Sequence, residues 1–162
     1  MIGLGAALAL APSGDIFVGH NVYDECRTPT QCPEHPTAAY LARYDSSGMR
    51  LSEQIFTHPG GLVRIHGVAV AGDDLVIAGM LTSSELLELD PSGVGNIHAA
   101  RLGLDGTPRK LYRAEGNLIV NDVAASADGL VRVAGYTEGA VSWGGAQSKS
   151  FGDWDAFIVS IF

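Results

Sequence analysis

DDLVIAG, at residues 73–79, occurs in recognisable form at two other places in this 162-residue chain. GDIFVGH at 14–20 and GLVRVAG at 129–135 show the same order of a turn residue, a short run of β-forming residues and a small final residue. Each copy is preceded by an Ala-rich run that enters a turn. A unit that recurs at a fixed spacing predicts a repeat architecture.

A second block recurs at the same spacing. AYLARYDSSG at 39–48 matches IHAARLGLDG at 97–106, and the tail AFIVSIF at 156–162 matches the first part of both. The two independent markers agree on a period of about 58 residues. We therefore expect three copies of one structural unit.

Apolar residues in the aligned stretches fall into two columns that lie two residues apart, which is the period of a strand and not of a helix. The residues between the columns face the other way and are partly apolar, as expected for a sheet that is covered on both faces. We predict that Val133→Asp unfolds the chain, because it would bury a charge. The first column holds Ile16, Leu75 and Val131, the second Val18, Ile77 and Val133, and the residues between them are Phe17, Val76 and Arg132.

The chain is expected to be all-β, with short strands joined by turns rich in Asp and Gly. Four-stranded units repeated at this length suggest a β-propeller-like array of blades. The predicted blades cover 1–60, 61–117 and 118–162, and the last lacks its final strand. A β-sandwich or a solenoid is the alternative. The predicted strands are 5–11, 15–22, 38–45 and 50–57 in the first blade and 65–71, 74–81, 96–104 and 109–114 in the second.

The third repeat carries a family resemblance. It reads VAGYTEGAVSWGG and then FGDWDAFIVSIF, and it resembles the bacterial β-propeller repeats known as SBBP repeats, with the best match at 128–159. The turns Asp45–Gly48 and Asp105–Gly106 match the turn of that pattern, whereas His20 stands where it has glycine. The resemblance implies a propeller fold and a secreted or cell-surface protein, and it implies no reaction.

The leading functional hypothesis is a non-catalytic scaffold or interaction module that binds a carbohydrate or protein ligand at its loops. The alternatives are a propeller hydrolase or lyase that acts on carbohydrate or peptide, and a truncated propeller fragment without independent function. Because three blades do not close a ring, we expect a homodimer or further upstream blades to complete it. An exposed strand edge at the third blade would otherwise invite pairing with another chain.

Composition narrows the possible partners. The formal net charge is −8 with only 10 Lys and Arg residues, so nucleic acid is not an expected partner. No apolar run is long enough to span a membrane, and no cofactor is expected. The opening MIGLGAALALAPSG has an apolar run of the length found in a signal peptide, with small residues before a plausible cleavage point, but it lacks basic residues before that run. We therefore expect it to be the first strand and its turn.

The segment YDECRTPTQCPEHP, at 23–36, lengthens one loop of the first blade and holds both cysteines. In a protein that resembles a secreted family, a disulfide between Cys26 and Cys32 is the first expectation. Free thiols, or a zinc site that adds His35 and a fourth ligand such as His20, are the alternatives. The loop is also a candidate for partner binding, through Asp24, Glu25, Arg27, Glu34 and His35.

The remaining candidates are expected to be structural. His20, His58, His66 and His98 fall in different segments, and none has an evident nucleophile or carboxylate beside it in the sequence. DSSG at 45–48 and DPSG at 90–93 suggest turns more than calcium loops. Aromatic residues beside carboxylates sometimes bind sugars, but packing between blades is the expected role of Trp143 and Trp154.

Overall fold

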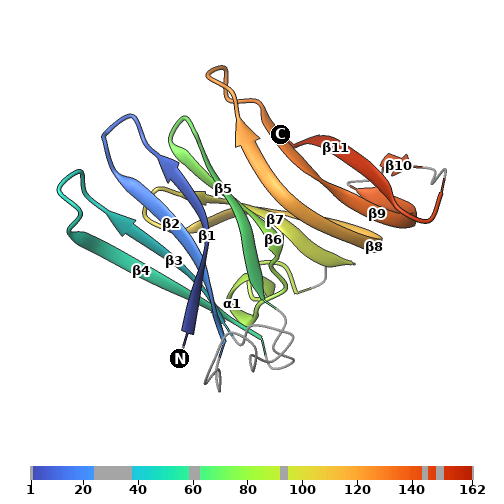
Figure 1. The fold of residues 1–162 in the computed structure, drawn as a ribbon, viewed down its shortest axis with the longest axis horizontal. Coiled ribbons are helices and arrows are strands. Elements are labelled where there is room, and N and C mark those ends of the chain that lie inside the picture. The colour runs from blue at the N-terminus through green and yellow to red at the C-terminus, as the bar shows by residue number, and fades with distance from the viewer. Residues whose placement is uncertain are drawn as a thin grey trace.

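The computed structural model describes residues 2–23, 38–58, 63–91, 95–143, 146–148 and 152–161. The fold is all-β, and every pair of neighbouring strands is antiparallel. The strands fan out in three groups from the blue N-terminal end to the red C-terminal end (Figure 1). The described residues include no helix long and apolar enough to cross a membrane.

The first repeat forms a sheet of its own, which we term unit 1. Its four strands follow one another in chain order, and the turns between them are short except at 24–37, which lies outside the described residues. The strands are β1 (Ile2–Leu10), β2 (Ile16–Tyr23), β3 (Ala38–Tyr44) and β4 (Arg50–Thr57).

The second and third repeats share one seven-stranded sheet. Unit 2 comprises the first three strands of this sheet and the first part of β8 (108–114), and unit 3 comprises the rest of β8 and the last three strands. A one-turn helix, α1 (Ser84–Leu87), lies in the connection between β6 and β7. The strands are β5 (Arg64–Ala71), β6 (Asp74–Met80), β7 (Asn96–Gly103), β8 (Pro108–Ala125), β9 (Val131–Trp143), β10 (Ala146–Ser148) and β11 (Asp155–Ile161).

Seven of the eight strands predicted in the first two repeats are confirmed to within three residues at each end. The region between units 2 and 3 differs from the expectation, because the strand predicted at 109–114 continues without a turn into the next repeat. The pairing register shifts between Glu115 and Asn117, and Gly116 between them has a φ of +113°. A bulge of this kind bends a strand without ending it, so one long strand serves both units.

Unit 2 lies between two hydrophobic cores. The first core joins unit 1 to unit 2, and the second joins the opposite face of unit 2 to unit 3. The alternation seen in the sequence assigns the faces: Leu75 and Ile77 lie in the first core, while Val76 lies in the second, and all three are fully buried. Val131 and Val133 of unit 3 are also fully buried in the second core.

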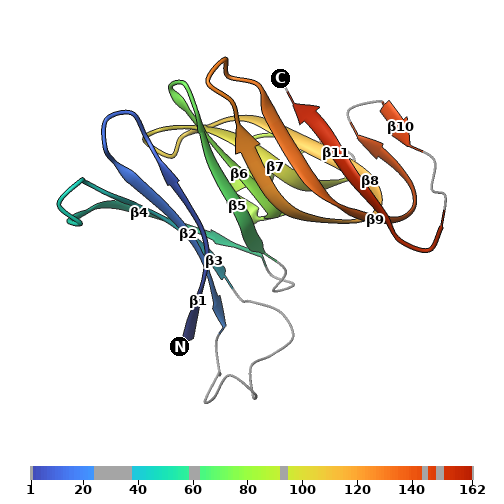
Figure 2. The same ribbon diagram turned by 45° about the horizontal axis from the view of Figure 1, so that its top comes forward.

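The first strands of the three units lie side by side. β1 contacts β5, and β5 contacts β8, so these strands form a row across the middle of the molecule (Figure 2). Gly67 in β5 permits the second contact, since a Cβ atom there would lie 2.7 Å from the backbone nitrogen of Val123. The units therefore stack through their sheet faces and along their first strands.

Candidate functional site

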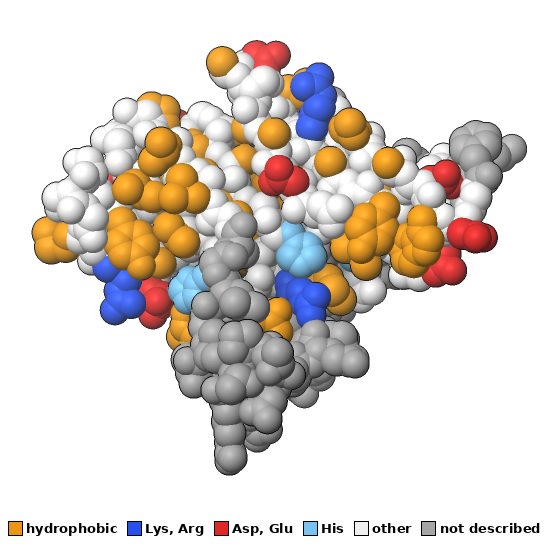
Figure 3. Space-filling view, in the orientation of Figure 1, with side chains coloured by type: hydrophobic (Ala, Val, Ile, Leu, Met, Phe, Trp, Pro, Cys, Tyr) orange, Lys and Arg blue, Asp and Glu red, His pale blue; other side chains and the backbone are white. Residues whose placement is uncertain are grey.

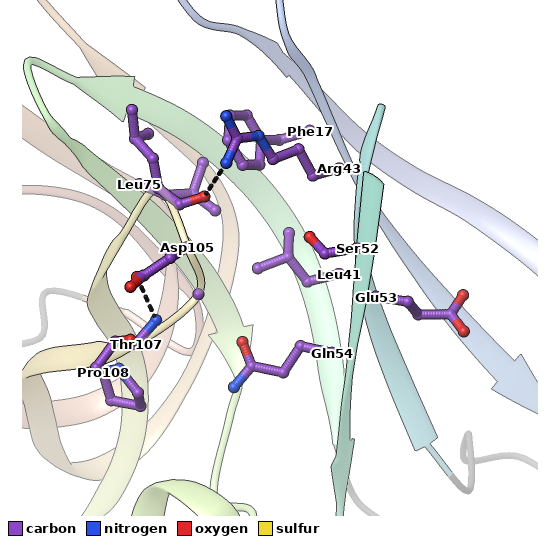
Figure 4. Close-up of a pocket in the computed structure, with 12 residues that line it drawn as sticks. Phe17, Leu41, Arg43, Ser52, Glu53, Gln54, Leu75, Asp105, Thr107 and Pro108 are labelled. Atoms are coloured by element: carbon purple, nitrogen blue, oxygen red, sulfur yellow. Dashed lines mark hydrogen bonds between the residues drawn. The ribbon is translucent and has the colours of Figure 1, made fainter. Parts of the chain in front are cut away.

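A hollow of about 350 Å³ lies at the junction of units 1 and 2 (Figure 4). One wall comes from β2, β3 and β4 of unit 1, and the other from β6 and the turn between β7 and β8 of unit 2. Its floor is apolar and its rim is polar, which is the usual composition of a small binding site. The lining residues are Phe17, Leu41, Arg43, Ser52, Glu53, Gln54, Leu75, Leu104, Asp105, Gly106, Thr107 and Pro108.

Arg43 connects the two walls. Its Nε and Nη2 atoms donate to Oδ2 of Asp15, at 3.1 and 2.5 Å, and its Nη1 atom donates to the carbonyl oxygen of Leu104 at 3.2 Å. The guanidinium also lies 5.7 Å from the centre of the Phe17 ring. Three kinds of contact thus hold one side chain, so Arg43 is a rigid part of the rim.

The turn of unit 2 presents a second polar group. Asp105 Oδ1 accepts a hydrogen bond from the Thr107 backbone nitrogen at 2.9 Å, and the contacts with Thr107 hold the pKa of this carboxyl below its usual range. Gly106 follows with a φ of +89°, and a Cβ atom there would lie 2.6 Å from Gln54 Oε1. Glycine therefore gives the turn its left-handed conformation and leaves room for the Gln54 side chain.

Gln54 extends from β4 across the hollow toward this turn, while the Glu53 carboxylate points away from it (Figure 4). Within the described part of the chain, Gln54 Oε1 is buried and has no hydrogen-bond partner. A buried amide oxygen without a donor is costly, so a ligand that brings an N–H or O–H group gains from binding here. The hollow is therefore suited to holding a small polar group over the apolar floor of Leu41 and Leu75.

A second candidate surface is the face of unit 1 that points away from unit 2. It carries Leu8, Leu10, Leu51 and Ile55, which are between 43% and 65% exposed. His20 and Tyr40 stack on the same face, with ring centres 5.0 Å apart. Hydrophobic side chains gather over this part of the molecule in the space-filling view (Figure 3). A contiguous apolar sheet face of this kind marks an interaction surface.

The loop that the sequence singled out lies outside the described residues. This applies to the expected disulfide between Cys26 and Cys32, to the zinc alternative with His35, and to the partner-binding hypothesis. The residues of that hypothesis are Asp24, Glu25, Arg27, Glu34 and His35.

The four described histidines do not converge on one site. His66 Nδ1 contacts the Val120 carbonyl oxygen, and His98 Nδ1 lies 3.3 Å from that of Gly79. Burial lowers the pKa of His98, and the Gly79 carbonyl only partly opposes this shift. In the part of the chain that the structure describes, no three His, Cys, Asp or Glu side chains are grouped so that they could hold a metal ion.

The two tryptophans have different surroundings. Trp143 is 9% exposed and belongs to the second core, where its ring lies 6.1 Å from that of Phe157. Trp154 is 52% exposed and makes an edge contact with Tyr136 on the outer face of unit 3. Packing between units therefore describes Trp143 but not Trp154.

The carboxylate of Asp45 accepts hydrogen bonds from residues of its own turn. Oδ1 of Asp45 accepts hydrogen bonds from Ser47 Oγ and from the backbone nitrogens of Ser47 and Met49, at 2.6, 2.8 and 2.9 Å. These contacts, led by the Ser47 hydroxyl, lower the pKa of Asp45. The carboxylate thus stabilises the turn, as the turn interpretation of DSSG expects.

The junction hollow was not predicted from the sequence. One signal was available, because Arg43 and Arg101 occupy the same position of their repeats. Each pairs with an aspartate at the N-terminal end of the preceding strand: Asp15, directly before β2, and Asp74, the first residue of β6. The missing information was the contact of Arg43 with the next unit, which only the stacking of the sheets creates.

Comparison with known proteins identifies no relative from which a family could be assigned. No protein-family model matches the chain, and a search of curated proteins returns no significant match.

Proposed function

We propose that this chain is a non-catalytic scaffold or interaction module made of β-propeller-type units, from a secreted or cell-surface protein of the SBBP-repeat kind. The observation that carries the proposal is the stacking of three equivalent units in one direction. The column of Leu75 and Ile77 faces the preceding unit, and so does the column of Val131 and Val133.

The same stacking pattern indicates what the outer face of unit 1 would contact. Ile16 and Val18 occupy the columns of Leu75 and Ile77, yet they are only partly buried, and no described unit covers them. In units 2 and 3 these columns always receive the face of another unit. The outer face of unit 1 is therefore built to accept one more propeller-type unit.

Unit 3 has the complementary surface, namely the face that units 1 and 2 each turn toward the following unit. The outer face of unit 3 carries the column that Phe17 and Val76 fill at the two internal junctions. Here that position is the exposed Arg132, and the same face exposes Ile158 to 73%. Two copies that pair head to tail would bury both end faces with the contact that the chain already uses twice. Six units would then form one closed ring, which is a permitted size for a propeller.

Light scattering on a sizing column tests the association. We expect about twice the 16.9 kDa mass of one chain. Leu10→Glu and Ile158→Glu should each give the monomer, because each places a charge on one end face. Leu89→Glu is the matched control, since Leu89 is 48% exposed but follows α1 and lies on neither face. A monomeric wild-type chain would contradict the second-copy arrangement and would leave further units of a longer polypeptide as the occupant.

A glycan array tests the module role. We expect reproducible binding without release of product, with carbohydrate or protein ligands meeting the loops at the ends of the units or the junction hollow. Gln54→Leu removes the unpartnered acceptor of the hollow, so it should weaken a ligand held there. Turnover of any bound glycan would contradict the non-catalytic role.

A further inference from the structure

A small cavity of about 130 Å³ lies where β6 and β7 separate. The last pair in the ladder between these strands is Ala78 and Ala99, and beyond it the two segments are held by a hydrogen bond from Ile97 N to Thr82 Oγ1 at 3.0 Å. Unit 1 contributes one residue to the wall, His58, which directly follows β4. The lining residues are His58, Met80, Thr82, Asn96, Ile97 and His98.

His98 lies in a bulge, because the register of β7 on β8 shifts between Ile97 and Ala99. A bulge turns its side chain away from the regular alternation of the strand. The imidazole is buried, at 4% exposure, and its Nδ1 lies 3.3 Å from the carbonyl oxygen of Gly79. Since a carbonyl oxygen only accepts hydrogen bonds, Nδ1 carries the proton of the neutral ring.

The other ring nitrogen of His98 is therefore left with a lone pair. Within the described residues, Nε2 is buried and has no hydrogen-bond partner. An imidazole that donates from one nitrogen to a backbone carbonyl and keeps a lone pair on the other has the usual arrangement of a metal ligand. His98 is thus oriented as a metal-binding histidine would be.

Two further residues of the wall are metal ligands by type. In the part of the chain that the structure describes, no third His, Cys, Asp or Glu joins His58 and His98, so the remaining ligand is the thioether of Met80. His58 and Met80 are only half-buried. Their side chains can therefore adjust to an ion that is held first by the rigid His98, and methionine is especially adaptable.

The charge of the cavity indicates which ion fits. No Lys, Arg, Asp or Glu is among the residues that line it. The cost of burying an ion rises steeply with its charge, so a neutral wall suits a monovalent ion better than a divalent one. Imidazole nitrogen and thioether sulfur are together suited to Cu(I), which is a soft ion.

We propose that His98, His58 and Met80 bind a Cu(I) ion between units 1 and 2. The bond to His98 forms through Nε2, and the Gly79 carbonyl keeps the ring in place. The site shares no lining residue with the junction hollow, and it goes beyond the module role without depending on it. Because the ligands come from both units, Cu(I) should also stabilise the first junction.

Titration with Cu(I) under anaerobic conditions, in competition with a chromophoric chelator, tests the proposal on the full chain. The chain carries Cys26→Ser and Cys32→Ser, so that thiols do not bind the ion, and Trp154→Phe, which leaves Trp143 as the single tryptophan. The ring of Trp143 lies 6.0 Å from that of His98. We expect one equivalent of Cu(I) to bind and to quench the emission of Trp143.

Three variants in this background identify the ligands. His98→Phe keeps a buried ring and should abolish the quenching, whereas Met80→Leu should weaken Cu(I) binding about tenfold, or about 1.4 kcal/mol. His20→Phe is the matched control, because His20 stacks on Tyr40 at the outer face of unit 1. It should bind Cu(I) as tightly as its parent.

Nitrogen NMR of the unsubstituted chain locates the bond without any variant. Cu(I) should shift the Nε2 resonance of His98 and leave Nδ1 protonated. An unchanged His98 resonance, equal binding by His98→Phe and His20→Phe, or tighter binding of Zn(II) than of Cu(I) overturns the proposal. Light scattering of the copper-free chain tests ring closure separately, so failure of the ring and failure of the copper site are distinguishable.

Discussion

The two junctions between units use different means to hold similar apolar cores. At the first junction, units 1 and 2 belong to separate sheets and are tied by polar side chains that bond to the backbone of the neighbouring unit. Asn21 bonds to both the N–H and the C=O of Ile65, and Arg43 bonds to the carbonyl of Leu104. At the second junction, β8 runs through both units, and their ladders form one sheet.

The contrast between the junctions indicates which one should open first. Continuous backbone couples units 2 and 3, so they should open together. Unit 1 depends on its core contacts and on a few buried polar groups, whose loss leaves donors and acceptors without partners. Four substitutions, in order of decreasing expected effect, test this contrast.

Val133→Asp should unfold the protein. Val133 is fully buried in the second core, and a carboxylate there has no described cationic neighbour, so we expect a loss above about 4 kcal/mol. Thermal melting followed by circular dichroism measures it. Leu89→Asp is the control, because Leu89 is 48% exposed and lies on neither end face. A normal melting curve for Val133→Asp would refute the assignment of the columns.

Asn21→Ala should weaken the first junction. Asn21 is 7% exposed, its Nδ2 donates to Ile65 O at 3.0 Å, and its Oδ1 accepts from Ile65 N at 2.9 Å. The variant leaves two buried backbone groups without partners, so we expect a loss of about 3 kcal/mol in urea unfolding. Asn117→Ala removes only an exposed bond to Glu138 and should change stability by less than about 0.5 kcal/mol. Equal effects would show that the first junction does not depend on this contact.

Arg43→Met should have a smaller effect at the same junction. The side chains of Arg43 and Asp15 are 30% and 14% exposed, so solvent weakens the ion pair, and we expect a loss of about 1 kcal/mol. Arg50→Met, which breaks a more exposed pair with Glu53, should have almost no effect. Hydrogen exchange should show faster opening of β2 and β3 in Arg43→Met, with β9 unchanged. Faster exchange in β9 would indicate that the two junctions are coupled.

His98 should give a small pH dependence. Burial lowers its pKa in the folded state, so the unfolded chain takes up the proton first as the pH falls. The stabilising contribution of neutral His98 is complete above its unfolded pKa of about 6.5 and decreases below it. His98→Phe should therefore lose less stability than the wild type between pH 7.5 and pH 5.5. Parallel curves would contradict a buried neutral imidazole.

Much of the fold was open to prediction, because strand period and turn chemistry are local properties. Alternation placed Leu75 and Val76 on opposite faces, and both are buried, which requires a covered sheet. The join between units 2 and 3 was not predicted. Residues 114–118 read AEGNL, and one glycine there is compatible with either a turn or a bulge. Pairing with β7 and β9 selects the bulge.

The candidate sites were harder to predict, because each is made between units. Arg43 stood out as a marker of the repeat, but Leu104, which accepts its hydrogen bond, is 61 residues away. The same holds for Gln54, whose side chain meets Gly106 of the next unit. The residue types within one repeat do not indicate which residues of the next unit they will contact.

The repeat, the strands and the two apolar columns of each unit follow from residue spacing and residue type. Which of these columns are buried depends on how the units stack. Ile16 and Leu75 are equivalent in sequence, yet Leu75 is fully buried and Ile16 is not. The reason is physical: burial belongs to the pair of surfaces that meet, and a strand encodes only one of them.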